Sequence, residues 1–195
     1  MAKKVLILKG SPREKGNSNM LADRAAAGAQ EAGAQVESIY LHGLDIRPCD
    51  GCDLCKENGV FCVIEDDMQS LYPKLLDAEA MILATPIYWF TYSAQLKLCI
   101  DRWYGLWNFK PDIFKGKPMG IILTYGDTDL YTSGAINAIH TFETMLRFLD
   151  APILGMVYGS VNDPGEVEKH PELMEAAYKL GQRLVMEKAE TLPTP

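Results

Sequence analysis

Four of the five cysteines in this 195-residue chain lie close together in the sequence. The pattern C-x2-C-x2-C-x6-C places Cys49, Cys52, Cys55 and Cys62 in one short segment. Disulfides are rare in reducing compartments, where clustered cysteines more often serve metal or redox chemistry. The spacing alone leaves a metal centre, a redox centre and a set of free thiols open.

A second chemical signal is the segment Gly-Ser-Pro-Arg-Glu-Lys-Gly-Asn-Ser at 10–18, which joins an apolar run to a helical pattern. Free N–H groups and the dipole at a helix N-terminus attract an anion. The segment matches neither Walker A nor G-x-G-x-x-G, and Tyr40-Leu41-His42 offers no acidic residue for a ribose. A mononucleotide phosphate therefore fits better than a dinucleotide, with a plain Gly- and Ser-rich connector as the alternative. The side chains that could bind this phosphate are Ser11, Arg13, Asn17 and Ser18.

A third signal is the aromatic segment Thr-Pro-Ile-Tyr-Trp-Phe-Thr-Tyr-Ser at 85–93. Four aromatic residues in one loop are hard to explain by core packing. A flat ring system could stack on such side chains and take hydrogen bonds from the backbone at its edges. The alternative is an aromatic interface between subunits, and both can hold at once.

Short apolar runs alternate with helical patterns, which predicts parallel strands joined by right-handed crossovers. We expect an open, doubly wound five-stranded parallel sheet of order 2-1-3-4-5 with helices on both faces, since the polar second strand suits an edge. The predicted strands are Val5–Leu8, Val36–Tyr40, Ala80–Ala84, Met119–Thr124 and Ile153–Tyr158. Ligands of such sheets lie beyond the carboxyl ends of the strands. The loops at 10–18, 85–93 and 125–133 should therefore lie side by side, with the cysteines on a long loop at 41–66.

The composition bounds the class of protein. The length suits one domain, and we expect residues 1–195 to form it. The net charge is −7, which argues against a nucleic-acid partner. No apolar run approaches the ~18 residues of a membrane span, and no signal-peptide pattern opens the chain. The expected location is the cytoplasm, with no membrane partner.

Three motifs together carry a family resemblance. They are Gly-Ser-Pro-Arg…Gly-Asn-Ser after the first strand, Thr-Pro-Ile-Tyr-Trp after the third, and Ser-Ala-Gln-Leu-Lys…Ile-Asp-Arg-Trp in the next helix. In these motifs the chain resembles the NADPH-dependent FMN reductase family, which implies a flavodoxin-like fold that binds FMN and can take electrons from NAD(P)H. The resemblance implies phosphate contacts from Ser11, Arg13, Gly16, Asn17 and Ser18. It implies contacts to the isoalloxazine from Pro86, Ile87, Tyr88 and Trp89, and a third contact loop of Tyr125, Gly126 and Asp127.

Within that family, the cysteine run resembles that of the iron–sulfur flavoproteins. This resemblance implies that Cys49, Cys52, Cys55 and Cys62 bind a 4Fe–4S cluster. The chemistry agrees, because thiolates at i, i+3 and i+6 in a tight turn can reach three corners of one cube. A zinc site is an alternative, although zinc usually draws on two separated C-x2-C pairs. The other alternative is four free thiols in a cluster-free reductase.

The expected function is that of an FMN-dependent oxidoreductase, in which the flavin supplies the chemistry. The sequence offers no acid–base dyad, so we predict no catalytic side chain. With a cluster, a one-electron donor of the ferredoxin type would be coupled to a two-electron acceptor. Without one, NAD(P)H would reduce FMN, and a quinone or another small acceptor would reoxidise it. Alternatives from other classes are a flavodoxin-type electron carrier and a zinc-stabilised interaction domain.

Three further expectations concern packing. Cys99 lies on the apolar stripe of a helix and is expected to be a core thiol. The acidic run Glu65-Asp66-Asp67 suits the start of a helix at Met68. Aromatic residues in the helix near Trp103, together with the 85–93 loop, predict a homodimer or homotetramer with closed symmetry.

Overall fold

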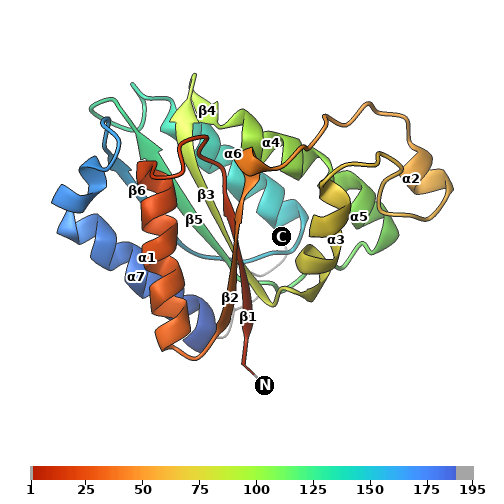
Figure 1. The fold of residues 1–195 in the computed structure, drawn as a ribbon, viewed down its shortest axis with the longest axis horizontal. Helices are drawn as coiled ribbons and strands as arrows, with labels where there is room; N and C mark the ends of the chain where they lie inside the picture. Colours follow the sequence, from red (N-terminus) through yellow and green to blue (C-terminus); the bar gives the residue numbers. More distant parts are fainter. Residues whose placement is uncertain (1, 188–195) are drawn as a thin grey trace.

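The computed structural model describes residues 2–187, which form a parallel sheet between two layers of helices (Figure 1). The parallel strands lie in the order β2-β1-β3-β5-β6, which confirms the predicted order of the five expected strands. A sixth, two-residue strand pairs antiparallel with β3 and was not predicted. The strands are β1 (Lys4–Lys9), β2 (Gln35–Tyr40), β3 (Ala80–Tyr88), β4 (Thr91–Tyr92), β5 (Met119–Tyr125) and β6 (Ile153–Ser160).

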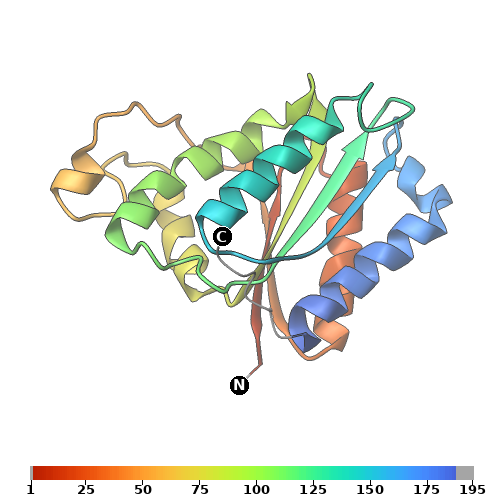
Figure 2. The same ribbon diagram turned by 180° about the vertical axis from the view of Figure 1, so that it is seen from behind.

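Helices cover both faces of the sheet, as Figures 1 and 2 show from opposite sides. One face carries α1 (Asn17–Glu31) and α7 (Pro171–Met186). The other face carries α3 (Met68–Asp77), α4 (Ala94–Asp101), α5 (Trp103–Phe109) and α6 (Ala135–Phe148). A short helix, α2 (Leu54–Glu57), lies outside these layers on the cysteine loop.

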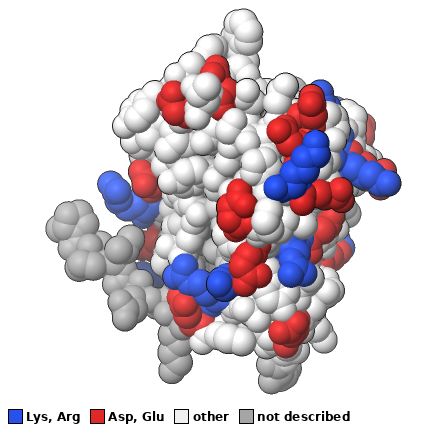
Figure 3. Space-filling model, turned by 90° about the vertical axis from the view of Figure 1, so that its left-hand side faces the viewer, with Lys and Arg blue, Asp and Glu red and all other residues white. Residues whose placement is uncertain are grey.

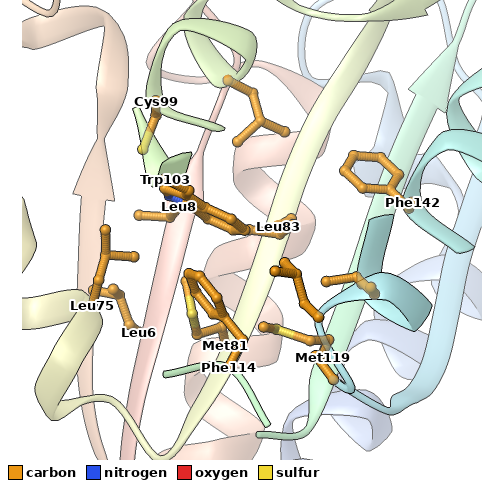
Figure 4. Close-up of a cluster of buried hydrophobic side chains, with 14 of the residues drawn as sticks. Leu6, Leu8, Leu75, Met81, Leu83, Cys99, Trp103, Phe114, Met119 and Phe142 are labelled. Carbon is orange, nitrogen blue, oxygen red and sulfur yellow. The ribbon is translucent and has the colours of Figure 1, made fainter. Parts of the chain in front are cut away.

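The sheet separates two hydrophobic clusters, because alternate side chains of a strand point to opposite faces. On β1, Leu6 and Leu8 join the cluster beneath α3–α6, whereas Val5 and Ile7 join the cluster beneath α1 and α7. Figure 4 shows the first of these clusters, in which Cys99 is fully buried. Burial raises the pKa of the Cys99 thiol to about 12, so the predicted core thiol is confirmed.

Several boundaries differ from those expected. The 85–93 segment is largely a β-hairpin, because β3 continues to Tyr88 and turns back into β4. Gly16 is the N-cap of α1, and no side chain caps that helix. The helix expected to carry Cys99 and the aromatic residues near Trp103 divides into α4 and α5, with Arg102 between them. These differences all fall beside the carboxyl edge of the sheet or the cysteine loop, where long-range contacts set the local backbone.

The face over α7 and its neighbours carries interspersed acidic and basic side chains, with no continuous basic patch in this view (Figure 3). No helix in the described part of the chain has both the length and the apolar character needed to cross a membrane.

The burial of Lys117, which lies just before β5, can be tested through the pH dependence of stability. Its Nζ is buried and donates a hydrogen bond to the Leu75 carbonyl at 2.7 Å. Burial lowers the pKa of Lys117 to about 8, below the 10.5 of an exposed lysine. Between these values the unfolded chain binds more protons than the folded one, so stability rises with pH.

We expect the free energy of unfolding of the wild type, relative to Lys117→Met, to increase by about 2 kcal/mol from pH 7 to pH 10. Denaturant titrations of both proteins at the two pH values measure this difference. An identical difference at both pH values would contradict the burial of a charged lysine.

Candidate cofactor site

A cavity of about 450 Å³ opens at the carboxyl ends of β1, β3 and β5. Its walls come from the loop after β1, the β3–β4 hairpin, the loop after β5 and the segment after β6. The structure brings all twelve residues predicted to contact a cofactor to this one cavity: Ser11, Arg13, Gly16, Asn17, Ser18, Pro86, Ile87, Tyr88, Trp89, Tyr125, Gly126 and Asp127. Six lining residues were not predicted: Phe90, Thr124, Thr132, Ser133, Val161 and Asn162.

The loop after β1 is held in a fixed shape by its own backbone. The Gly10 N–H donates to the Ala84 carbonyl at 2.7 Å, which ties the loop to β3. The Gly16 N–H donates to the Arg13 carbonyl at 2.9 Å, and the Tyr40 hydroxyl donates to the Pro12 carbonyl at 2.7 Å. A Cβ atom on Gly16 would lie 2.3 Å from Ser11 Oγ, so only glycine permits this close return of the chain. The loop therefore forms a concave seat before α1.

Ser18 gives this seat a polar group that lacks a hydrogen-bond partner. Ser18 lines the cavity, and its fully buried hydroxyl finds no hydrogen-bond partner among residues 2–187. Buried polar groups without a partner are costly, and a bound ligand commonly supplies the missing bond. The first N–H groups of α1 also lack partners within the helix, and the helix dipole favours a negative charge there. These features fit a phosphate group.

Asn17 has a role that its sequence position did not reveal. Its Nδ2 donates to the carbonyls of Asp163 at 2.9 Å and Val161 at 3.4 Å. Its Oδ1 accepts the N–H of Val167 at 3.2 Å. The side-chain amide is thus committed to bonds within the protein. The same bonds place Val161 and its neighbour Asn162 on the cavity wall.

The β3–β4 hairpin has an unusual turn. Its two central residues, Trp89 and Phe90, have φ values of 49° and 69°, in the left-handed region that glycine and asparagine normally occupy. Such a conformation costs about 1–3 kcal/mol for each non-glycine residue, and it recurs at functional sites. Asn137 anchors the turn by donating to the Phe90 carbonyl at 3.2 Å. The Trp89 indole, 91% exposed, projects at the mouth of the cavity.

The third wall is shaped by a turn around Asp129. The Asp129 carboxylate accepts the N–H groups of Thr132 at 3.0 Å and Tyr131 at 2.7 Å. These bonds, with those from the hydroxyls of Thr132 and Thr128, lower the pKa of Asp129 to about 2. The carboxylate stays ionised at physiological pH and keeps Thr132 and Ser133 at the cavity rim.

The four predicted metal ligands are not gathered. Cys55 on α2 is buried, Cys62 is partly buried, and Cys49 and Cys52 are exposed. Within residues 2–187 no three cysteine, histidine, aspartate or glutamate side chains are grouped as a metal site. The structure therefore does not show the predicted cluster, which stays a prediction. The loop that carries them projects beside α3 and α5, away from β6 (Figures 1 and 2).

Comparison with known proteins decides the family. The NADPH-dependent FMN reductase family matches residues 3–164. The chain belongs to this family. Membership confirms the predicted resemblance and makes the protein an FMN-dependent oxidoreductase. FMN and NAD(P)H are the cofactors that the family uses.

Individual relatives of this reductase carry two kinds of name. It is 32% identical over 186 residues to YwqN of Bacillus subtilis, named as an NAD(P)H-dependent FMN-containing oxidoreductase, covering 92% of this chain and 97% of that protein. It is 40% identical over 99 residues to an iron–sulfur flavoprotein of Methanocaldococcus jannaschii, a match that spans 51% of each chain.

Solved structures agree on the fold of this reductase. The Trp repressor binding protein of Bacillus subtilis shares 32% identity at a TM-score of 0.68, over 91% of this chain and 99% of that one. An NAD(P)H:quinone oxidoreductase of Methanothermobacter marburgensis has a TM-score of 0.76 at 22% identity, over 96% of this chain and 98% of that one. The second likeness shows the fold alone.

The phosphate seat generates a direct test on this reductase. We expect the double variant Arg13→Ala, Ser18→Ala to bind FMN about 2–4 kcal/mol more weakly than the wild type, roughly 30- to 700-fold in Kd, because two donors to the phosphate are removed. Quenching of flavin fluorescence on titration of the apoprotein measures the affinity.

Lys15→Ala is the matched control, since Lys15 is a basic residue of the same loop that is exposed and does not line the cavity. It should bind FMN like the wild type. Equal FMN affinity in the double variant and the control would sink the assignment of the phosphate to this loop.

Proposed function

We propose that the cavity binds FMN with its phosphate at the N-terminus of α1 and its ring beside the β3–β4 hairpin. The observation that carries this proposal is the buried, unpartnered hydroxyl of Ser18, a residue that lines the cavity at the start of a 15-residue helix. The guanidinium of Arg13 lies at the same wall and adds a charge complementary to phosphate.

The other walls suit a flat ring. Pro86, Ile87, Tyr88 and Trp89 supply apolar and aromatic surface from one side. The backbone at Tyr125, Gly126 and Asp127 offers donors and acceptors from the other side, where the ring's polar edge would lie. Bound FMN would accept a hydride from NAD(P)H and deliver the electrons to a small acceptor. The protein's part is to hold the ring and leave one side of the cavity open for these partners.

Turnover separates this proposal from the flavodoxin-type alternative. The FMN-loaded protein should oxidise NADPH or NADH continuously when a water-soluble quinone is present. A pure electron carrier would show almost no steady-state turnover with these substrates, and that result would refute the reductase proposal.

A second function is favoured by the cysteine run and by the relatives named iron–sulfur flavoproteins. We propose that the 49–62 loop is the part of the chain that would bind a 4Fe–4S cluster. Cys49 and Cys52 would then have to turn inward from their exposed positions toward Cys55 and Cys62. The predicted ferredoxin-type donor depends on this cluster and is proposed only with it.

We expect protein purified anaerobically to contain about four irons per chain. The count should fall sharply in Cys52→Ala and stay unchanged in Cys99→Ala, because Cys99 is a core thiol far from the loop in sequence. Iron and acid-labile sulfide analysis measures this. Protein that is only yellow, with four titratable loop thiols and full NAD(P)H oxidation in Cys52→Ala, would support the cluster-free reductase instead.

Trp103, one of the aromatic residues behind the predicted self-association, is buried in the core and cannot form an interface. Other aromatic residues are exposed and support the prediction. Trp89, Tyr131, Phe148 and Phe109 are all at least half exposed. Contiguous exposed apolar patches usually mark an interface. We expect a dimer or tetramer in analytical ultracentrifugation at micromolar concentration, and a single monomeric species would refute it.

The five unpaired cysteines support the predicted cytoplasmic location, a reducing compartment.

A further inference from the structure

A buried ion pair lies at the base of the cysteine loop. Arg102, between α4 and α5, meets Asp66, which precedes α3. Its Nη1 lies 2.6 Å from Asp66 Oδ2 and its Nη2 lies 3.3 Å from Oδ1, a two-pronged contact. Both side chains are fully excluded from solvent. Burial works against the charge of Asp66, but the bonds from Arg102 outweigh it and hold the pKa of Asp66 below its usual value.

The same guanidinium also binds both ends of the cysteine loop. Nη1 donates to the Arg47 carbonyl at 3.0 Å, just before Cys49. Nη2 donates to the Ile64 carbonyl at 3.5 Å, just after Cys62. Asp66 adds a bond from the other side, because its Oδ2 accepts the Arg47 N–H at 3.0 Å. One ion pair thus joins the two stems between which all four clustered cysteines lie.

Other hydrogen bonds also hold the base of the cysteine loop. Gln69 on α3 donates from Nε2 to the carbonyls of Cys62 at 2.9 Å and Ile64 at 2.7 Å. The Asp45 N–H donates to Asp67 Oδ2 at 2.8 Å, and the Asp67 N–H returns to the Asp45 carbonyl at 3.1 Å. The expected acidic helix start is present, since Asp66 Oδ1 accepts the Met68 N–H at 3.0 Å, but Asp66 mainly serves Arg102.

Helix α4 connects this base to the cofactor cavity. Arg102 follows its last residue, and Ser93 caps its first turn. The buried Ser93 hydroxyl donates to the Gly10 carbonyl at 2.6 Å, and the Ser93 N–H donates to Thr85 Oγ1 at 3.0 Å. Eight helical residues span about 12 Å. A buried polar anchor therefore sits at each end of one short helix, one on the phosphate loop and one on the cysteine loop.

We propose that Arg102 and Asp66 are positioning residues that close the cysteine loop at its base and, through α4, hold it at a fixed separation from the cofactor cavity. That the cysteines of this loop bind a cluster rests on the proposed function, whereas the closure of the loop by Arg102 and Asp66 does not. A buried ion pair adds little net stability compared with apolar residues of similar size, so its place here is explained by what else it binds. Apolar replacements could fill the space but could not hold the Arg47 and Ile64 carbonyls.

The test therefore compares stability with order in the loop. The main variant is Asp66→Leu with Arg102→Met, which replaces the pair by apolar side chains. Arg102→Lys keeps the charge without the fork, and Asp101→Asn removes an exposed partner of Lys97 as the matched control. Thermal unfolding, amide exchange by mass spectrometry and the alkylation rate of each cysteine are measured in protein without added iron. The buried Cys99 is the internal reference.

We expect the apolar variant to unfold within a few degrees of the wild type while amides of residues 49–63 exchange about tenfold faster or more. Cys55, which is buried in the wild type, should be alkylated faster by a similar factor, and Cys99 should not change. Arg102→Lys should fall between these limits, and Asp101→Asn should match the wild type. If the apolar variant does not fold, Arg102→Lys decides the question with the same two rates.

The proposal would be overturned if a folded variant of Arg102 and Asp66 showed the same amide exchange rates and the same cysteine alkylation rates as the wild type. The cluster is tested separately, by loading the same proteins anaerobically with ferrous iron and sulfide. If the wild type binds no iron and the loop loses protection only in the variants of Arg102 and Asp66, the cluster is refuted and the closure of the loop is supported. Wild type that binds about four irons, with equal iron content and equal loop protection in all variants, refutes the closure by Arg102 and Asp66 and supports the cluster.

Discussion

A strand whose two faces are both buried can be joined to a parallel neighbour only by a crossover that passes over one face of the sheet. β1, β3 and β5 are such strands, with nearly continuous buried runs at the centre of the sheet. Each crossover returns the chain to the same end, so the segments that follow these strands must meet at the carboxyl edge. The cavity, its phosphate seat and its aromatic wall all depend on this constraint.

Sequence periodicity was sufficient for this level of the structure because it depends on local hydrophobicity. The strand order and the three loops around the cavity could be predicted from apolar runs and from the polarity of β2. Bonds between distant segments could not. Asn17 binds residues near 161–167, far along the chain, and nothing around it in the sequence distinguishes that use from a phosphate contact. Trp89 and Phe90 also lack the glycine or asparagine that usually signals a tight hairpin.

The cysteines show the same limit for chemistry. Their spacing fixes which ligand types are available, but the direction of each side chain depends on packing. Cys55 packs beneath α5, where a Cβ on Gly105 would lie 3.4 Å from its own Cβ, while Cys49 and Cys52 face solvent. The Arg102–Asp66 ion pair could not be predicted from the sequence for a related reason. It joins residues 36 positions apart, one in an acidic run typical of a helix start and one inside a helical stripe.

The contact between Gly134 and Phe90 has a consequence for how molecules enter the cavity. A Cβ on Gly134 would lie 2.6 Å from Phe90 Cα, so the hairpin tip rests directly on the start of α6. The rim residues Thr132 and Ser133 immediately precede that same point in the chain. The two sides of the entrance therefore share one support and cannot separate without shifting α6. A wider entrance would therefore need a movement of the helix as well as of the hairpin, so the packing of α6 on the sheet also bears on the size of the opening.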